Sequence, residues 1–521
     1  PPAKKYRCLP AVLLLAALAG YAWLSGSFLC QFPYVHSDEA WLSGLTRAIW
    51  EQGSFGATEP FFNLKPRWPH GIKLLFHSLQ GLALRLGGYR IAAFRLLSLA
   101  AALPCLALFY LAARRLFPER REPALLATLL LGLDVQFIYA SHLARQEIFI
   151  LLALCACLLL LLKAGVLANR EILGLGLITG LAAGFHPNAF LIACMCGAAL
   201  LARLAFGQAR ARQLLLYIVA AGAAAGVFVL ISLGLDQQFF SHYAAYAQSE
   251  FGLNLSLAER LGEAPDFWRK LFAGVSGTYY LPELRPQLFL FPTMSLLLGC
   301  YVLAMRREQR EEAARAGLLL SAALGLTAGI MLIGRYNQLS LVFLFPLGWL
   351  ITMAALNLFG KGLCRALSGL ALAIVIACSW TSISPWLATD YQDYLAEFQA
   401  HIPAGAKTLA NLNSEYAFAE GQLLDYRNLA YLAENGLDIA GYVAKYEIAY
   451  IAYSDELDYI DQHRPYWNVI YGDIDIQGLK AYLAQHCRLV HAFKSPVYGV
   501  RITGLVGAGD YGWVGIYQVV K

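Results

Sequence analysis

The sequence predicts a polytopic α-helical membrane protein of about eleven transmembrane helices, followed by a soluble α/β domain. Of its 521 residues, 59% are hydrophobic and 14% are charged, whereas soluble domains carry about 25% charged residues. Long apolar runs recur as far as residue 385, and the composition then becomes that of a water-soluble domain. We therefore expect a membrane domain over 1–385 and a second domain over 386–521.

Eleven apolar runs are long enough, or nearly so, to cross a bilayer. In chain order they are 9–29, 91–113, 123–140, 146–162, 171–185, 188–206, 213–235, 288–305, 314–334, 338–358 and 364–385. If the N-terminus is cytoplasmic, the six inner segments hold 18 lysines and arginines, and the short outer turns hold only Arg145 and Arg335. This asymmetry follows the positive-inside rule. The net charge of +6 therefore orients the protein in its membrane and does not indicate binding to nucleic acid.

This topology leaves three large parts outside the membrane. The first two are the loops 30–90 and 236–287, and the second of these is rich in tyrosine and phenylalanine. The third is the C-terminal domain, in which short β-type runs alternate with polar helical stretches. The expected strands are 407–411, 448–453, 468–471, 488–493, 498–502 and 515–520, and the expected helices are 389–400 and 476–485. This mixed pattern predicts a small α/β domain.

Two adjacent carboxylates, Asp38 and Glu39, follow closely after the first apolar run. Ser37 is expected to cap a new helix whose first turn holds both carboxylates, near the positive end of the helix dipole. Apolar residues then recur at helical spacing, which predicts a helix lying along the membrane surface. Acidic residues are common in first turns for structural reasons alone. The pair becomes a candidate site only in combination with residues elsewhere.

Other polar side chains gather in the outer segments. They are Lys65 in the first loop, His142, Arg145 and Glu147 at the outer start of the fourth run, His186 and Asn188 in one short turn, and Arg335 and Tyr336 in another. Such convergence is what an interfacial active site needs. Plainer explanations exist, because Arg145 and Glu147 can form a simple ion pair and Lys65 can be an ordinary solvated charge. Tyr336 and the residue before it can anchor the chain at the membrane interface.

Four short motifs carry a resemblance to a known family. They are His36-Ser37-Asp38-Glu39-Ala40, Phe61-Phe62-Asn63-Leu64-Lys65-Pro66, Tyr139-Ala140-Ser141-His142-Leu143-Ala144-Arg145-Gln146-Glu147, and Gly334-Arg335-Tyr336 followed by Pro346. Together they resemble the membrane glycosyltransferases of the GT-C fold, in the bacterial branch related to protein O-mannosyltransferases and the lipid A aminoarabinose transferase. Leu64 stands where the aminoarabinose transferase has an acidic residue involved in metal binding, so the resemblance implies no metal cofactor here.

The resemblance implies a polyprenyl-phosphate-linked monosaccharide as donor and a lipid, a glycan or a protein as acceptor. It places Asp38 and Glu39 at the catalytic centre, where Asp38 would take the proton from an acceptor hydroxyl. The residues implied in binding the donor phosphate and sugar are Lys65, His142, Arg145, Glu147, Arg335 and Tyr336. Transfer is expected at the outer face of a bacterial cytoplasmic membrane, with the N-terminus in the cytoplasm and the C-terminal domain outside.

A transporter or a flippase of lipid-linked sugars is the alternative function. Such a protein needs charged residues deep within its spans, along a path between the two faces. Arg95 and Asp134 are the main charges inside the predicted spans, and the other polar residues gather on one side. The sequence therefore favours a transferase.

Overall fold

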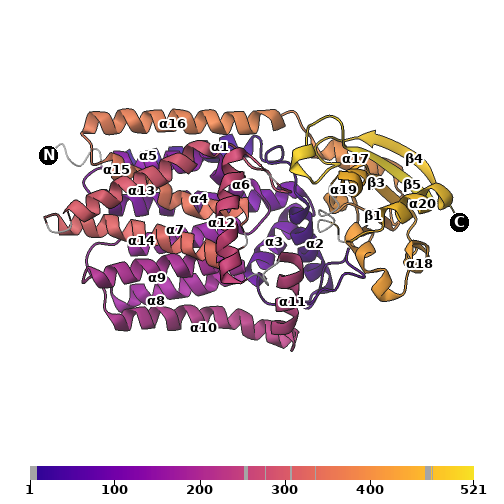
Figure 1. The fold of residues 1–521 in the computed structure, drawn as a ribbon, viewed down its shortest axis with the longest axis horizontal. Coiled ribbons are helices and arrows are strands. Elements are labelled where there is room, and N and C mark those ends of the chain that lie inside the picture. The colour runs from indigo at the N-terminus through magenta and orange to yellow at the C-terminus, as the bar shows by residue number, and fades with distance from the viewer. Residues whose placement is uncertain are drawn as a thin grey trace.

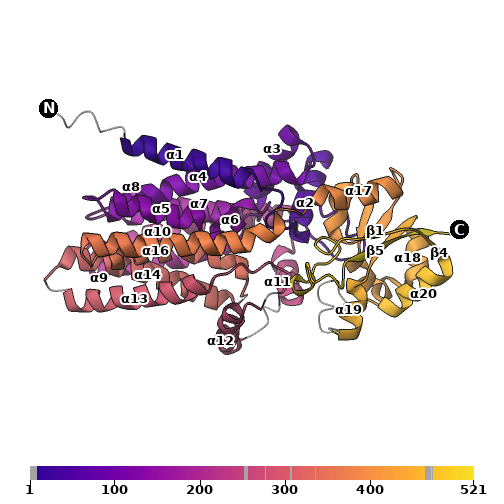
Figure 2. The same ribbon diagram turned by 90° about the horizontal axis from the view of Figure 1, so that it is seen from above.

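The computed structural model describes residues 9–251, 256–275, 277–305, 308–334, 336–463, 471 and 473–520. A bundle of helices forms one end of the elongated molecule, and a mixed α/β domain forms the other (Figure 1). The helices α2 (Ser37–Gln52) and α3 (Leu74–Gly87) lie between these two parts (Figures 1 and 2). The predicted fold class, a helical membrane protein with a C-terminal α/β domain, is confirmed.

Each of the eleven predicted spans contains a helix. The bundle helices are α1 (Leu9–Gly26), α4 (Ile91–Leu116), α5 (Glu122–Leu133), α6 (Val135–His142), α7 (Glu147–Leu161), α8 (Asn169–Leu181), α9 (Phe190–Ala205), α10 (Ala211–Leu235), α13 (Arg285–Met305), α14 (Arg310–Ile333), α15 (Phe345–Leu356) and α16 (Lys361–Ile383). Among the described residues, seven helical segments are long and apolar enough to cross a membrane, and the pair α5–α6 brings this to eight. Because α1, α7 and α8 are not among these segments, the count of eleven spans stays a prediction.

The third predicted span, 123–140, contains two helices that are separated by a break at Asp134. α5 and α6 meet there at 59°. Asp134 has extended backbone angles, and its carboxylate accepts the N–H of Gln136 at 3.0 Å as the N-cap of α6. The side-chain amide of Gln287 donates to the same carboxylate at 2.9 Å. The buried acid is thus a capping residue, which explains why it stands inside an apolar run.

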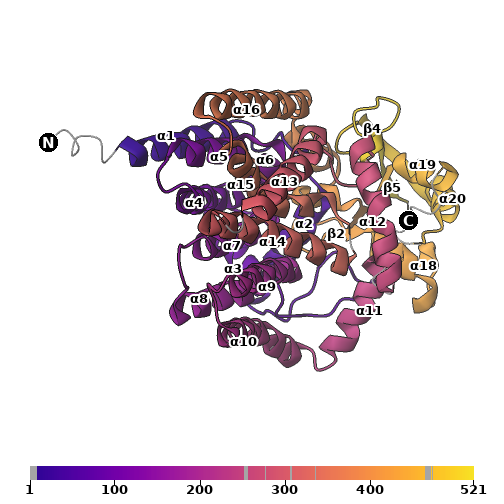
Figure 3. The ribbon, with the colours of Figure 1, turned by 60° about the vertical axis from the view of Figure 1, so that its left-hand side comes forward.

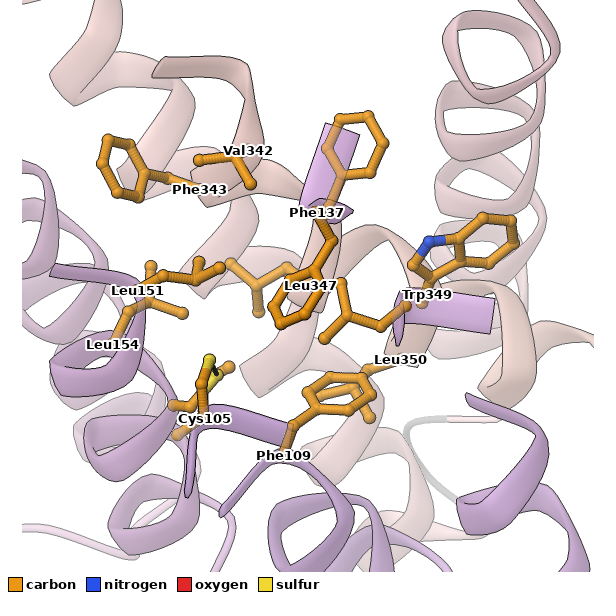
Figure 4. Packing of buried hydrophobic residues seen from close by; sticks show 14 of the residues in the cluster. Cys105, Phe109, Phe137, Leu151, Leu154, Val342, Phe343, Leu347, Trp349 and Leu350 are labelled. Atoms are coloured by element: carbon orange, nitrogen blue, oxygen red, sulfur yellow. Dashed lines mark hydrogen bonds between the residues drawn. The ribbon is translucent and has the colours of Figure 1, made fainter. Parts of the chain in front are cut away.

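The centre of the bundle is a dry hydrophobic core. Figure 4 shows Cys105 and Phe109 of α4, Phe137 of α6, Leu151 of α7 and Trp349 of α15 converging there, and all five side chains are buried. The core connects helices that are far apart along the chain. It therefore holds the outer ends of α6 and α7, where the candidate site lies, in a fixed relation to α4.

The loop 236–287, which is predicted to lie outside the membrane, contains two helices, α11 (Phe239–Phe251) and α12 (Leu257–Ala273). Both run across the direction of the bundle helices (Figure 3). Ser256 caps α12 and accepts the N–H of Glu259 at 3.3 Å. Gly274 ends the helix with a φ of 72°, a backbone conformation that glycine adopts without strain. The chain then returns toward the start of α2.

The C-terminal domain contains a five-stranded sheet of order β2-β1-β3-β5-β4. Its strands are β1 (Thr408–Ala410), β2 (Leu423–Asp425), β3 (Tyr450–Ser454), β4 (Cys487–Lys494) and β5 (Trp513–Val519), with helices α17 (Tyr391–His401), α18 (Ile439–Lys445), α19 (Glu456–His463) and α20 (Ile476–His486). β1 is parallel to β2 and β3, and β5 is antiparallel to β3 and β4. Four of the expected strands and both expected helices are confirmed, and β2 was not expected.

The expected strand at 498–502 is wrong, because side chains of the β3–α19 region satisfy its backbone groups in place of a neighbouring strand. Ser454 donates to the carbonyl oxygen of Gly499 at 2.6 Å. The carboxylate of Glu456 accepts the N–H groups of Arg501 and Ile502 at 2.5 and 2.7 Å. Of the expected strand 468–471, residues 468–470 lie outside the described residues.

Candidate active site

The start of α2 is organised by His36, so the expectation that Ser37 is the cap is wrong. The Nδ1 atom of His36 accepts the N–H of Asp38 at 3.0 Å, and Glu39 accepts the N–H of His36 at 2.9 Å. Burial lowers the pKa of His36 to about 4, so the ring is neutral and Nδ1 can accept. Ser37 is the first helical residue and is buried. This reciprocal capping fixes both carboxylates in the first turn.

Glu39 lies in the interior and joins three segments. Its carboxylate receives two hydrogen bonds from the guanidinium of Arg95, at 2.9 and 2.8 Å. It also accepts the N–H of Ala144 at 2.8 Å, in the turn between α6 and α7. The side chains of Glu39 and Arg95 have no exposed surface. We therefore infer that Glu39 positions the first turn of α2 against α4 and that it does not contact a substrate.

Asp38 is the carboxylate that reaches the surface, with 26% of its side chain exposed. The guanidinium of Arg145 and the hydroxyl of Tyr279 both donate to its Oδ2 atom. Burial alone would raise the pKa of Asp38, but the guanidinium of Arg145 and the Tyr279 hydroxyl outweigh burial and hold this pKa well below its usual value. Asp38 is therefore an anion at any physiological pH.

Arg145 is held by a second carboxylate. Its Nη2 atom donates to Glu147 at 2.9 Å, while Nη1 donates to Asp38. Arg145 and Glu147 line a small cavity of about 30 Å³ together with His186, Asn188 and Asn337. Three outer segments that the sequence analysis grouped thus meet at one place. The ion pair of Arg145 with Glu147 exists, as the plainer explanation predicted, but it also aims the guanidinium at Asp38.

Lys65 is buried, so the interpretation of an ordinary solvated charge is wrong. Its Nζ atom lies 5.6 Å from the ring centre of Trp41 and 5.5 Å from that of Phe62. Beside it, Arg67 pairs with Glu59 at 2.5 Å, and the indole of Trp41 donates to the same carboxylate at 2.6 Å. Two cations therefore lie against an aromatic surface at the base of the first loop.

The C-terminal domain holds the Lys65 loop in place through Asn428. The side-chain oxygen of Asn428 accepts the N–H groups of Asn63, Leu64 and Lys65 at 3.0, 3.1 and 3.3 Å. Its amide group donates to the carbonyl oxygen of Phe61 at 2.8 Å. One buried side chain from residue 428 thus fixes the backbone of four residues in the first loop.

Asn428→Ala is expected to lower the free energy of unfolding by about 1–3 kcal/mol, because buried amide groups would lose their acceptor. Cleavage within the first loop should also become faster in limited proteolysis. Asn435→Ala is the matched control, since the side chain of Asn435 donates to the carbonyl oxygen of Tyr431 in an exposed contact. Equal stability and equal cleavage for the two variants would contradict this role for Asn428.

Two residues that the sequence analysis missed complete the cluster. Tyr279 follows α12, and besides its bond to Asp38 its ring stacks on His36 with centres 4.3 Å apart. Lys73 precedes α3, is partly buried and has a φ of 76°, which is unusual for a residue with a side chain. Burial, with the neighbouring charge of Arg67, lowers the pKa of Lys73 to about 8. The negative charge of Asp38 acts in the opposite direction and raises the pKa of Lys73.

The structure places two predicted residues in supporting positions. His142 is fully buried, and its Nδ1–H donates to the carbonyl oxygen of Phe32 at 2.7 Å. The hydroxyl of Tyr336 donates to the carbonyl oxygen of Arg260 in α12 at 2.7 Å. These contacts hold the chain before α2 and the helix α12. Arg335 lies outside the described residues.

The C-terminal domain also reaches the loop that carries Tyr279. The N–H of Thr503 donates to the carbonyl oxygen of Gly277 at 3.0 Å. The hydroxyl of Thr503 lies 3.0 Å from that of Tyr34, two residues before His36. The site is therefore enclosed by the membrane bundle, by both large outer loops and by the C-terminal domain.

Comparison with known proteins identifies this architecture. Residues 74–233 match the family model described as dolichyl-phosphate-mannose-protein mannosyltransferase. The solved structure of ArnT from Cupriavidus metallidurans bound to undecaprenyl phosphate superposes with a TM-score of 0.59 at 12% identity, over 98% of each chain. The chain has the GT-C fold. None of the curated protein sequences matches it.

A second GT-C structure is also similar. The oligosaccharyltransferase of Archaeoglobus fulgidus in the apo form superposes with a TM-score of 0.54 at 14% identity, over 98% of this chain and 74% of that one. The same enzyme tethered to an acceptor peptide containing the NVT sequon gives a TM-score of 0.54 at 13% identity. At these identities the likeness is one of fold, which for GT-C proteins means a multi-pass membrane domain.

Proposed function

We propose that the chain is a glycosyltransferase that moves a monosaccharide from a polyprenyl-phosphate donor to a lipid, glycan or protein acceptor. We place the reaction at the outer face of a bacterial cytoplasmic membrane. The observation that carries the proposal is the ionised, partly exposed Asp38 in a pair with Arg145, with the charge of both residues acting on Lys73. The GT-C fold and the undecaprenyl phosphate named for ArnT support a lipid-linked donor.

The cations suit a leaving phosphate. When the bond between the sugar and the phosphate breaks, negative charge accumulates on the phosphate oxygens, and preorganised cations stabilise it. Arg145, Lys65 and Lys73 are the residues that we assign to this role. An acceptor hydroxyl would attack the anomeric carbon from the side opposite the phosphate, so the configuration would invert.

Asp38 is assigned as the base that takes the hydroxyl proton. In the resting site its pKa is too low for an effective base, because Arg145 donates to it. A donor phosphate that binds the same guanidinium would withdraw part of that charge from Asp38. The pKa of Asp38 would then rise, so donor binding itself prepares the base. For a phosphate acceptor, which needs no base, Asp38 would instead orient the acceptor or the sugar.

An apolar cavity in the bundle offers space for a lipid tail. It has a volume of about 400 Å³ and lies between α13, α15 and α16. Its lining includes Phe289, Leu290, Trp349, Leu370 and Ile374. We propose that part of the polyprenyl chain lies here, where its hydrocarbon would contact the apolar side chains that line the cavity.

The transporter alternative is not favoured by the interior charges. Arg95 is paired with Glu39, and Asp134 caps α6. Both charges therefore have structural roles, and neither is left to serve a transport path. The deciding experiment uses purified protein in detergent with no sealed vesicle present. Radiolabelled sugar should pass from a polyprenyl phosphate to an acceptor extract, which a transporter cannot do, and absence of transfer to lipid, glycan and protein fractions alike would contradict the proposal.

The low pKa of Lys73 predicts an alkaline limit to activity. Its ammonium group is charged below about pH 8 and neutral above it, so kcat/KM should fall as the pH rises through about 8. In Lys73→Arg the guanidinium stays charged, and the fall should disappear. Lys73→Met should weaken donor binding about 10- to 100-fold, the value of a hydrogen bond to a charged group.

The control for this series is Lys361→Arg, at the exposed start of α16. It should keep the wild-type pH profile. An unchanged alkaline fall in Lys73→Arg would remove Lys73 from the donor site, without bearing on Asp38.

A further inference from the structure

A group of possible metal ligands lies in the C-terminal domain, on elements that the candidate active site does not use. Glu397 and His401 are four residues apart on α17, so they lie on the same face of that helix. His491 lies on β4, an edge strand of the sheet. One ligand atom from each of the three side chains lies within 4.8 Å of the other two. All three residues are partly buried, which leaves a path for an ion from solvent.

The two imidazole rings lie against each other. They stack with centres 3.6 Å apart and an angle of 3° between the rings. Because the lone pair of a ring nitrogen lies in the plane of its ring, one of the two parallel rings has to turn before both can bind a single ion.

Hydrogen bonds orient each ligand. The Nδ1–H of His401 donates to the carbonyl oxygen of Glu397 at 2.9 Å, which directs the lone pair to Nε2. The Nε2 atom of His491 lies 2.9 Å from the carboxylate of Glu397. His401 presents its Nδ1 atom to the same carboxylate at 4.0 Å. The ring of His401 therefore has to turn to offer Nε2 to a cation, and that cation would replace the direct contact of His491 with Glu397.

A neighbouring cavity adds room for a further ligand. It has a volume of about 200 Å³, and Glu397 lies in its wall together with Asp390, Asp393 and Lys494. Glu397 is therefore shared between the possible metal ligands and an open space. Water or an acceptor group in this cavity can complete the coordination of an ion held by three side chains.

We propose that Glu397, His401 and His491 bind one divalent transition metal ion, for which zinc is the best match, and that the ion ties α17 to the edge strand β4. Two imidazoles and one carboxylate form a ligand set that zinc accepts in tetrahedral geometry with one open position. α17 is the first long helix after the last helix of the bundle, and β4 lies at the far edge of the sheet. The ion would therefore fasten the C-terminal domain next to its connection with the membrane.

The test uses the full-length protein in detergent, first stripped of metal with a chelator. Calorimetric titration with zinc chloride alone should give one tight site per chain. Cobalt(II) at the same site should give the visible absorption of a tetrahedral centre. His401→Gln and His491→Gln should each weaken zinc binding at least about tenfold and abolish the cobalt spectrum, because a ligand is lost. Zinc should raise the melting temperature of the wild type and leave that of both variants unchanged.

Two controls separate this site from others. His486→Gln changes an exposed histidine of the same domain, and Asp38→Asn changes the candidate active site. Both should keep the full affinity and the cobalt spectrum. If a histidine variant does not fold, Glu397→Gln keeps both rings and should still weaken zinc binding. Equal zinc affinity in the wild type and in the ligand variants, or no tight site at all, would overturn the proposal.

Discussion

Asp38→Asn is expected to lower the kcat of sugar transfer by about 10²- to 10⁴-fold, the usual contribution of a general base. Asparagine keeps the size of the side chain and can still accept from Tyr279. It has no basic oxygen for the acceptor proton, and it no longer balances the charge of Arg145. Donor affinity should stay equal or increase, because Arg145 no longer has Asp38 as a competing partner for the phosphate. A loss confined to kcat would separate a catalytic role from a binding role.

The measurement is steady-state transfer by purified variants, with donor binding measured separately. Asp438→Asn is the matched control, since Asp438 caps α18 in the C-terminal domain and asparagine caps helices equally well. It should retain full activity. An Asp38→Asn variant with wild-type kcat would exclude Asp38 as the base for a hydroxyl acceptor, while an acceptor phosphate would be consistent with a small effect.

The helices of the bundle could be predicted because a membrane span is a local signal. A run of about 20 apolar residues has few alternatives to a helix in a bilayer. The break at Asp134 could not be predicted in the same way. It depends on the cap that Asp134 forms and on a contact with Gln287, which is 153 positions away.

The candidate site could be predicted only in part. The alternation of inner and outer loops places Asp38 and Arg145 on the same side, and they form an ion pair. Tyr279 is 241 positions from Asp38, and its loop carries no motif that singles it out among the many tyrosines there. Lys73 has a positive φ, which its residue type does not indicate. Contacts of this kind are set by tertiary packing and leave no periodic trace in the sequence.

The adjacent carboxylates illustrate what spacing alone cannot decide. Asp38 and Glu39 are equivalent in sequence, but successive residues on a helix point about 100° apart. One is therefore turned toward the open site, and the other is turned toward Arg95. The choice between them follows from which side of α2 packs against α4, and only the fold determines that.

Glu39→Gln is expected to lower the free energy of unfolding by about 3–5 kcal/mol, the usual cost of removing one partner from a buried ion pair. The guanidinium of Arg95 would remain in the interior without a counter-charge. It would keep its bonds to the carbonyl oxygens of Leu29 and Pro33, at 2.9 and 2.8 Å, and could keep one bond to the neutral amide oxygen of the glutamine. Unfolding in mixed detergent, followed by circular dichroism, measures the change.

The control is Glu122→Gln, which removes the partner of Arg365 in a pair whose side chains are 39% and 63% exposed. Exposed pairs contribute about 0–1 kcal/mol, so this variant should be close to the wild type. The double variant Glu39→Gln with Arg95→Met should recover part of the lost stability, because the unpaired charge is then gone. If the Glu39→Gln variant were as stable as the wild type, Arg95 would not determine the position of this side chain. The backbone N–H groups of His36 and Ala144 would determine it instead. The first turn of α2 would then be held by its cap alone, and Asp38 would keep its place without the ion pair beneath it.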